Sequence, residues 1–123
     1  MSELVYKELS YKIIGIAMKV YNDLGAGFLE KVYENAMMIL FKNENIDAKQ
    51  QESIDVYYYK KKIGHYVTDI LVENKILIEL KTVDKITKVH KAQLINYLKA
   101  TNKKLGIIIN FNKEELEFER VVL

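Results

Sequence analysis

The sequence predicts a single α/β domain in which a mixed sheet is flanked by helices. Three observations support this fold class. The chain opens with two segments of helical periodicity, continues with a long segment rich in Ile, Val, Tyr and Thr, and returns to helical spacing before two short apolar strands. With 123 residues, half of them hydrophobic, it has the length of one domain and enough apolar side chains to close one core.

Two helices are predicted at the start of the chain. Residues 4–22 carry apolar side chains at helical spacing, and the glycines within 24–27 break the pattern. A second helix is expected over 28–45, ending in a polar, turn-rich segment. Its apolar stripe is expected to consist of Phe28, Leu29, Val32, Tyr33, Ala36 and Leu40.

The middle of the chain changes to the period of strands. Residues 53–83 are rich in β-branched and aromatic side chains and contain two turn-like breaks, which predicts a three-stranded antiparallel meander. Residues 84–102 then return to helical spacing. The segment 104–111 reads as a short, fully buried strand, and 117–123 as a last strand.

Composition narrows the chemistry that is available. Cysteine is absent and His65 and His90 are the only histidines, so any metal must be held mainly by oxygen. A net charge of +2 gives no strong electrostatic case for a nucleic-acid partner, although lysines cluster at 60–62 and 103–104. No segment resembles a signal peptide or a membrane span, which favours a soluble, cytoplasmic protein.

Asp69, Glu79 and Lys81 interrupt otherwise aliphatic runs in two of the predicted strands. Charged side chains in an antiparallel strand normally mark its solvent side. Residues 76–78 and Leu80 are apolar in succession, however, which is typical of a central strand covered on both faces. A carboxylate in such a strand is costly unless a cation satisfies it, and two facing carboxylates raise each other's pKa.

The turn between the two strands decides whether Asp69 and Glu79 share a face. A two-residue loop would place them on opposite faces, because side chains alternate along a strand. A three-residue loop over 73–75 would place them directly opposite each other, with Lys81 on the same face. Asn74 tolerates the left-handed conformation that such a loop needs. In this register Mg²⁺ would suit the acids, since it takes oxygen ligands and retains water.

These residues resemble a known family. The order Asp69, then Glu79-Leu80-Lys81 on the next strand, resembles the core of the PD-(D/E)XK nuclease superfamily. The segment GFLEKVY at 27–33 is similar to the signature of the GxxExxY proteins, which are placed in that superfamily. The resemblance covers nearly the entire chain and implies a restriction-endonuclease-like α-β-β-β-α-β core. Thr68 departs from the pattern, because the superfamily's name implies proline there.

The resemblance implies a metal-dependent nuclease. Asp69 and Glu79 would hold Mg²⁺ or Mn²⁺ with the backbone carbonyl of Leu80 as a third ligand, and Lys81 would orient or activate the attacking water. DNA is the expected substrate, RNA is left open, and cutting of both strands would suggest a homodimer. Two other interpretations compete with this one: a catalytically silent nuclease-fold module that binds nucleic acid or regulates, and a purely structural ion network.

Glu30 and Tyr33 come from the GxxExxY segment. Glu30 is implied as a further metal ligand or a ligand of the metal's water, but it also lies in the first turn of the predicted helix, where the helix dipole favours any glutamate. Tyr33 is expected to be a core aromatic whose hydroxyl finds a local partner.

A polar line is predicted on the helix within 84–102. Gln93 and Tyr97 are four residues apart and therefore share a face, and His90 lies three residues before Gln93. The pair resembles the Q-x-x-x-Y element of RecB-type members, which borders the active site. His90 is expected either to contact a phosphate or the metal's waters, or simply to lie at the surface or pack, and Lys88 and Lys91 beside it are candidate substrate contacts.

Overall fold

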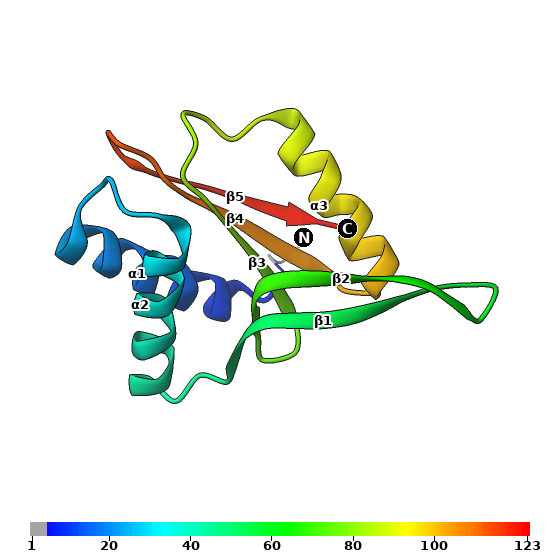
Figure 1. Cartoon of the computed structure of the whole chain (residues 1–123). Coiled ribbons are helices and arrows are strands. Elements are labelled where there is room, and N and C mark those ends of the chain that lie inside the picture. Colours follow the sequence, from blue (N-terminus) through cyan, green and yellow to red (C-terminus); the bar gives the residue numbers. More distant parts are fainter. Residues whose placement is uncertain (1–4) are drawn as a thin grey trace, which may run out of the picture.

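The computed structural model describes residues 5–123, which fold into three helices on the two faces of a five-stranded sheet (Figure 1). The predicted order of elements is confirmed. The elements are α1 (Lys7–Leu24), α2 (Glu30–Asn43), β1 (Ala48–Tyr58), β2 (Lys61–Val72), β3 (Ile76–Lys81), α3 (Lys88–Thr101), β4 (Leu105–Phe111) and β5 (Leu116–Val122). None of the helices in this range is long and apolar enough to cross a membrane.

The sheet is mixed, with the strand order β1-β2-β3-β4-β5. Strands β3 and β4 are parallel and are joined through α3, whereas the other neighbouring pairs are antiparallel. The predicted meander is therefore confirmed, although its first strand begins five residues earlier than expected, at Ala48. This arrangement makes β3 the central strand of the sheet.

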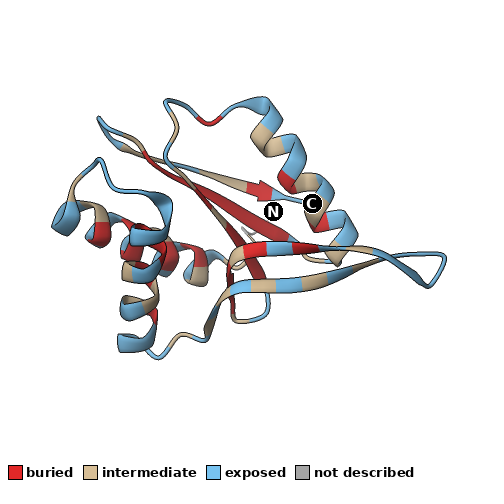
Figure 2. Ribbon diagram, viewed as in Figure 1, coloured by how far each residue is buried: buried red, intermediate tan, exposed pale blue. Residues whose placement is uncertain are grey.

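Strand β3 is apolar on both faces because helices cover both faces of the sheet. Ile76, Ile78 and Leu80 belong to the core cluster under α1 and α2, and Leu77 belongs to the second cluster, under α3. Figure 2 shows the buried residues concentrated along β3 and β4. By alternation, side chains two and four residues beyond Leu77 also point to the α3 face, so the charged end of β3 lies under α3.

The expected stripe of α2 is partly wrong. Leu29 is 78% exposed and Phe28 and Val32 are also exposed. The helix begins only at Glu30, so Phe28 and Leu29 lie in the preceding loop and do not share its periodicity. The apolar side chains that α2 does bury are spaced four residues apart: Tyr33, Met37 and Phe41.

Candidate active site

The turn between β2 and β3 has the odd length that aligns the positions of Asp69 and Glu79 across the two strands. Val72 pairs with Ile76, and the register continues to Ile70 opposite Ile78, leaving a three-residue loop. The next positions in this register are Asp69 and Glu79. Both Glu73 and Asn74 have positive φ, 52° and 54°, and the N–H of Lys75 donates to the Val72 carbonyl at 2.9 Å. The predicted left-handed conformation of Asn74 is therefore confirmed. Glu73 adopts the same conformation, which was not predicted.

Asp69 lies where the backbone pairing of β2 with β3 ends. Its Oδ2 accepts a hydrogen bond of 2.7 Å from the backbone N–H of Leu80, so a side chain takes the place of a strand partner. Burial raises the pKa of Asp69, opposed by this N–H and by Lys81. One residue earlier, Thr68 is fully buried and its hydroxyl donates to the Ile78 carbonyl at 3.3 Å, which ties the strand where proline was implied.

Glu79 is the most perturbed acid of the site. Burial raises its pKa from 4.5 to about 7, Lys81 lowers it and Glu30 raises it further. Its Oε1 is buried and has no hydrogen-bond partner within residues 5–123. A buried oxygen of this kind costs about 1–3 kcal/mol unless a ligand satisfies it, so Glu79 is poised to accept a proton or a cation.

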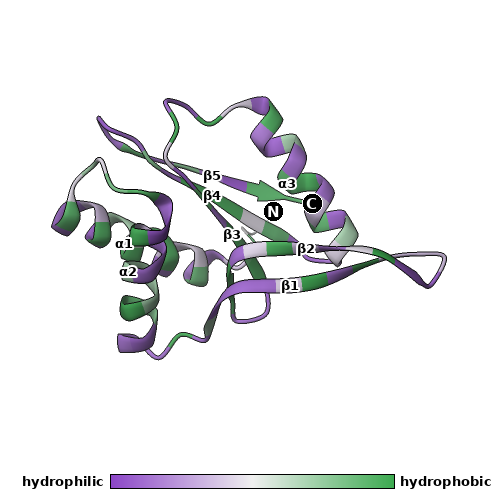
Figure 3. Cartoon of the chain, viewed as in Figure 1, coloured by the Kyte–Doolittle hydropathy of each residue, from purple (hydrophilic) through white to green (hydrophobic). Residues whose placement is uncertain are grey.

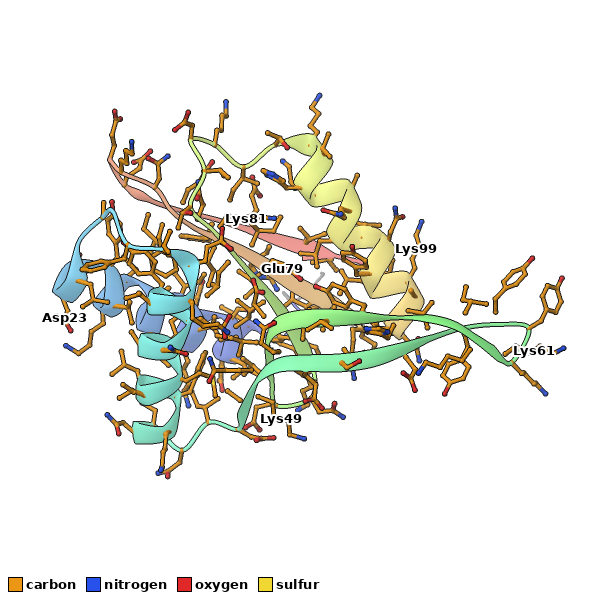
Figure 4. All side chains as sticks on the ribbon, viewed as in Figure 1. Asp23, Lys49, Lys61, Glu79, Lys81 and Lys99 are labelled. Atoms are coloured by element: carbon orange, nitrogen blue, oxygen red, sulfur yellow. The ribbon has the colours of Figure 1, made fainter. Side chains whose placement is uncertain are left out.

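Helix α3 forms a wall opposite Glu79 and Lys81 (Figure 4). A cavity of about 20 Å³, enough for about one water molecule, is lined by side chains from β3, β4 and α3. These are Glu79, Lys81, His90, Gln93, Leu94, Tyr97 and Ile108. Nε2 of Gln93 donates to the Tyr97 hydroxyl at 3.4 Å, and the Tyr97 ring stacks on Tyr66 at 3.8 Å. The structure thus brings the predicted polar line of α3 to Glu79 and Lys81.

The GxxExxY segment builds the loop that starts α2. Gly27 has a φ of 102°, which strains any other residue. Tyr33 is fully buried, donates to the Gly25 carbonyl at 2.6 Å and stacks on Phe111 at 4.1 Å, which confirms it as a core aromatic with a local partner. Glu30 is exposed at the first helical position, and its Oε2 accepts from the Thr82 hydroxyl at 3.5 Å. Glu30 is thus close to the site, at its rim.

His90 has a local structural role. Its Nδ1 accepts from the Thr87 N–H at 3.0 Å while its own N–H donates to the Thr87 hydroxyl, a capping box that begins α3 at Lys88. The helix therefore begins four residues later than predicted. With Nδ1 accepting, the ring proton of the neutral imidazole lies on Nε2. Lys88 is exposed, whereas Lys91 forms an ion pair with Glu119 at 3.5 Å.

A network behind Asp69 was not predicted. Glu34 is buried on α2, and its carboxylate accepts from Lys31 at 3.0 Å, Gln50 at 2.6 Å and Gln51 at 3.0 Å. Gln51 has a φ of 48° inside β1, and this turns its side chain to reach both Glu34 and, at 3.5 Å, Oδ1 of Asp69. A single glutamate in a helix gives no sequence signal for such a position, because most are solvated.

A second network holds the loop that follows Lys81. Asn110 is fully buried in β4, where it pairs with Lys81 in the strand register. Its side chain bonds both the N–H and the carbonyl of Val83, at 2.9 and 2.8 Å, and donates to Glu117 at 3.0 Å. Glu117 in turn accepts from the Ile86 N–H. Asn110 therefore fixes the backbone that leaves the charged end of β3.

The donor set fits a divalent ion that keeps part of its water. Among residues 5–123, no three Asp, Glu or His side chains are grouped as a metal cage, so Glu30 does not complete one with Asp69 and Glu79. Two carboxylates are what Mg²⁺ commonly takes from a protein. The N–H and C=O of one strand residue point to the same edge, so the Leu80 carbonyl faces the side where Asp69 lies. The unpartnered Oε1 of Glu79 is a further oxygen donor on the neighbouring residue of β3.

Solved structures resemble the fold at low sequence identity. The crystal structure of SSO0001 matches with a TM-score of 0.57 and 17% identity over 75% of this chain. This chain spans about half the length of SSO0001, 48%, and the likeness concerns the fold. An alkaline exonuclease, LHK-Exo from Laribacter hongkongensis, gives a TM-score of 0.46 and 10% identity over 99% of this chain and 72% of its own.

Sequence comparison gives a family. No curated protein matches the chain. The profile of the PD-(D/E)XK nuclease superfamily matches residues 7–121, from the start of α1 to β5, and thus includes the β2–β3 hairpin and the polar face of α3. The chain therefore belongs to the PD-(D/E)XK nuclease superfamily.

Proposed function

We propose that this protein is a metal-dependent nuclease of the GxxExxY group that hydrolyses phosphodiester bonds, with DNA as its substrate. Asp69, Glu79 and the Leu80 carbonyl would hold Mg²⁺ or Mn²⁺, and Lys81 would act on the attacking water. The observation that carries the proposal is the unpartnered, buried oxygen of Glu79 beside Lys81, at the point where β2 and β3 separate.

This arrangement would destabilise the folded protein if it were only a structural ion network. Burial raises the pKa values of both Asp69 and Glu79, and Oε1 of Glu79 has no hydrogen-bond partner within residues 5–123. A structural ion pair would be expected to lower the pKa of its acid. A bound divalent ion would neutralise both acids and supply charge stabilisation and a water of lowered pKa.

Side chains of the protein itself would carry out the remaining steps of the hydrolysis. The Lys81 ammonium lies beside Glu79, where it can orient a water and stabilise negative charge that develops on a phosphate oxygen. Gln93 and Tyr97 help to line a cavity with room for about one water, which they would hold against β3. Glu30, at the rim, is proposed to bind a metal-bound water, and Lys88 and the Nε2–H of His90 to contact phosphates of the substrate strand.

A cleavage assay with matched variants tests the proposal. Supercoiled plasmid, single- and double-stranded oligonucleotides and RNA are incubated with Mg²⁺, Mn²⁺ or EDTA. We compare Lys81→Ala with Lys49→Ala, which removes an exposed lysine of β1 remote from the site (Figure 4). We expect metal-dependent cleavage of DNA that Lys81→Ala abolishes and Lys49→Ala leaves intact. If both strands of a duplex are cut, the active species is expected to be a homodimer by light scattering.

The other outcomes are equally informative. Equal cleavage by the wild type and Lys81→Ala would identify a contaminating nuclease. Nucleic-acid binding without cleavage of any substrate, under either metal, would support the catalytically silent module instead. Calorimetry that detects no uptake of Mg²⁺ or Mn²⁺ would overturn the assigned ligands.

A further inference from the structure

The β1–β2 hairpin projects far beyond the rest of the sheet (Figure 1). Its outer end, residues 57–63, is here called the finger tip. It carries three consecutive tyrosines followed by three lysines. Tyr57, Tyr58 and Tyr59 are 59%, 64% and 83% exposed, and Ile63 is also exposed. Three neighbouring aromatic side chains are thus left in solvent, although β2 contributes buried core residues at its other end.

The backbone of the finger tip is strained at Tyr59 and Lys60, which both have positive φ. Tyr58 pairs with Lys61, so Tyr59 and Lys60 form a two-residue loop with φ values of 48° and 64°. Loops of this type strongly favour Asn-Gly, and positive φ is unfavourable for a bulky residue. The loop is therefore less stable with Tyr59 than it would be with Asn or Gly, and Tyr59 places an aromatic ring at the outer end of the hairpin.

The charge of the finger tip is uncompensated. Lys62 forms an ion pair with Asp55 at 3.1 Å, but Lys60 and Lys61 have no ion pair among the residues that the structure describes. Figure 3 shows the outer end of the hairpin as hydrophilic, in contrast to β3 and β4. The finger tip presents a single exposed aliphatic side chain, Ile63, whereas an element that binds in the lipid interface buries a whole face of large apolar side chains. Hydroxylated rings with lysines beside them suit single-stranded nucleic acid, whose exposed bases stack on aromatic rings and whose phosphates pair with ammonium groups.

We propose that the finger tip is a binding site for unpaired nucleotides, held by base stacking on Tyr58 and Tyr59 and by phosphate contacts of Lys60 and Lys61. The choice of ligand rests on the proposed function. Lys61 and Asp69 are separated along β2 by about 26 Å at the usual rise of a strand. Figure 4 places Lys61 at the far end of the hairpin from Glu79 and Lys81. The contacted bases therefore lie up to about eight stacked nucleotides from the cleavage position.

Binding of a labelled 20-nucleotide single strand, measured by fluorescence anisotropy in EDTA, tests the proposal. The variant Tyr58→Ser/Tyr59→Asn removes both rings, while Asn accepts the positive φ of position 59. We expect its affinity for the single strand to fall roughly tenfold, with a melting temperature equal to or above that of the wild type. The control Tyr11→Ser removes a tyrosine of similar exposure, 63%, from α1 and should bind like the wild type. A blunt duplex of the same length should respond little to the loss of the rings.

The lysines are tested separately through salt. Lys60→Ser/Lys61→Ser should reduce the slope of log affinity against log salt by about 1.4, the value for two lost phosphate contacts on a single strand. The proposal is overturned if the tyrosine variant binds as tightly as the wild type, if the wild type binds no oligonucleotide, or if it binds anionic vesicles in preference to the oligonucleotide. Cleavage with normal binding by the tyrosine variant would remove the finger-tip site and leave the nuclease proposal standing. Tyrosine-dependent binding without cleavage would keep the finger-tip site and remove the nuclease proposal.

Discussion

The carboxylate of Asp69 accepts a 2.7 Å hydrogen bond from the backbone N–H of Leu80 just beyond the last paired residues of β2 and β3. The two oxygens of this carboxylate have different partners. One oxygen satisfies a backbone donor of the central strand, and the other, Oδ1, lies 3.5 Å from Nε2 of Gln51. Substitutions that keep or remove an acceptor at this position can separate this structural role from the proposed binding of a metal.

Replacement of Asp69 is expected to have opposite consequences for stability, depending on the new side chain. Asp69→Asn keeps an acceptor for the Leu80 N–H and removes a carboxylate whose pKa burial raises, so its free energy of unfolding should stay within about 1 kcal/mol of the wild type or increase. Asp69→Ala leaves that N–H unsatisfied and should lose about 1–3 kcal/mol. Both variants should lose metal uptake and cleavage, measured by calorimetry and the plasmid assay. Asp23→Asn, at the exposed end of α1, is the control and should change neither. An active Asp69→Asn protein would remove Asp69 from the metal site.

The raised pKa of Glu79 predicts that the metal-free protein loses stability as the pH rises. Between pH 4.5 and about 7 the folded protein holds a proton that the unfolded chain has released, so the free energy of unfolding falls over this interval. The stabilisation is complete below about pH 4.5, is lost as the pH passes 7, and amounts to about 3 kcal/mol. The raised pKa of Asp69 acts in the same direction.

Urea denaturation in EDTA at pH 5, 6, 7 and 8 measures this effect. Glu79→Gln cannot ionise and should flatten the profile, becoming more stable than the wild type at pH 8 but not at pH 5. Mg²⁺ or Mn²⁺ should restore the stability of the wild type at pH 8 and have little effect on the variant. Glu114→Gln, in the exposed β4–β5 turn, should keep the wild-type slope. A wild-type profile that rises from pH 5 to 8 would contradict the assigned protonation of Glu79.

The sequence predicted the parts of this site that depend on strand alternation. A run of apolar residues from Ile76 to Ile78 identifies a central strand, and alternation then places Glu79 and Lys81 on one face. The length of the turn stayed open, because one left-handed residue was visible in Asn74 and the second, Glu73, carries no such preference. The structure decides for the three-residue loop.

The parts that could not be predicted depend on contacts between distant segments. The left-handed Gln51 is held by Glu34, 17 residues earlier, and local propensity gives no reason for a positive φ inside a strand. The start of α3 is set by the capping box of Thr87 and His90 and by a tertiary contact, since Glu117 accepts from the Ile86 N–H within the segment that was expected to begin the helix. The apolar residues of that segment do follow helical spacing, but hydrogen bonds to its backbone hold it in a different conformation.

Asn110 is predicted to be the polar residue on which the loop after β3 most depends. Asn110→Leu has a similar volume but leaves the Val83 N–H and carbonyl without their partner, so we expect a loss of about 2–4 kcal/mol in the free energy of unfolding. Amide hydrogen exchange at Val83 should accelerate more than exchange in β1. Asn112→Ala removes an amide from the same region, where it donates to the Asp84 carbonyl at 2.5 Å on the surface, and should cost less than about 1 kcal/mol. Similar losses in both variants would show that burial of Asn110 is not what matters.

Two glycines are predicted to respond to alanine with opposite signs. A Cβ at Gly106 in β4 would meet Cδ2, Cγ and Cδ1 of Leu94 at 2.7, 2.8 and 2.9 Å, so Gly106→Ala must displace a buried side chain of α3 and should lose about 1–3 kcal/mol. A Cβ at Gly15 in α1 would meet nothing within 4 Å, and Gly15→Ala should gain about 0.5–1 kcal/mol through helix propensity.

Leu94 also lines the cavity beside Glu79, so the Gly106→Ala substitution reaches the site. Displacement of Leu94 should alter the cavity beside Glu79 and reduce cleavage, whereas Gly15→Ala should leave cleavage unchanged. Urea denaturation and the plasmid assay on the two variants give both readouts. A Gly106→Ala protein of wild-type stability would mean that α3 can shift away from β4, and its wall could then not hold a single water against β3. A destabilised Gly15→Ala protein would mean instead that the exposed surface of α1 is covered in solution, since the isolated chain leaves room for the added methyl group.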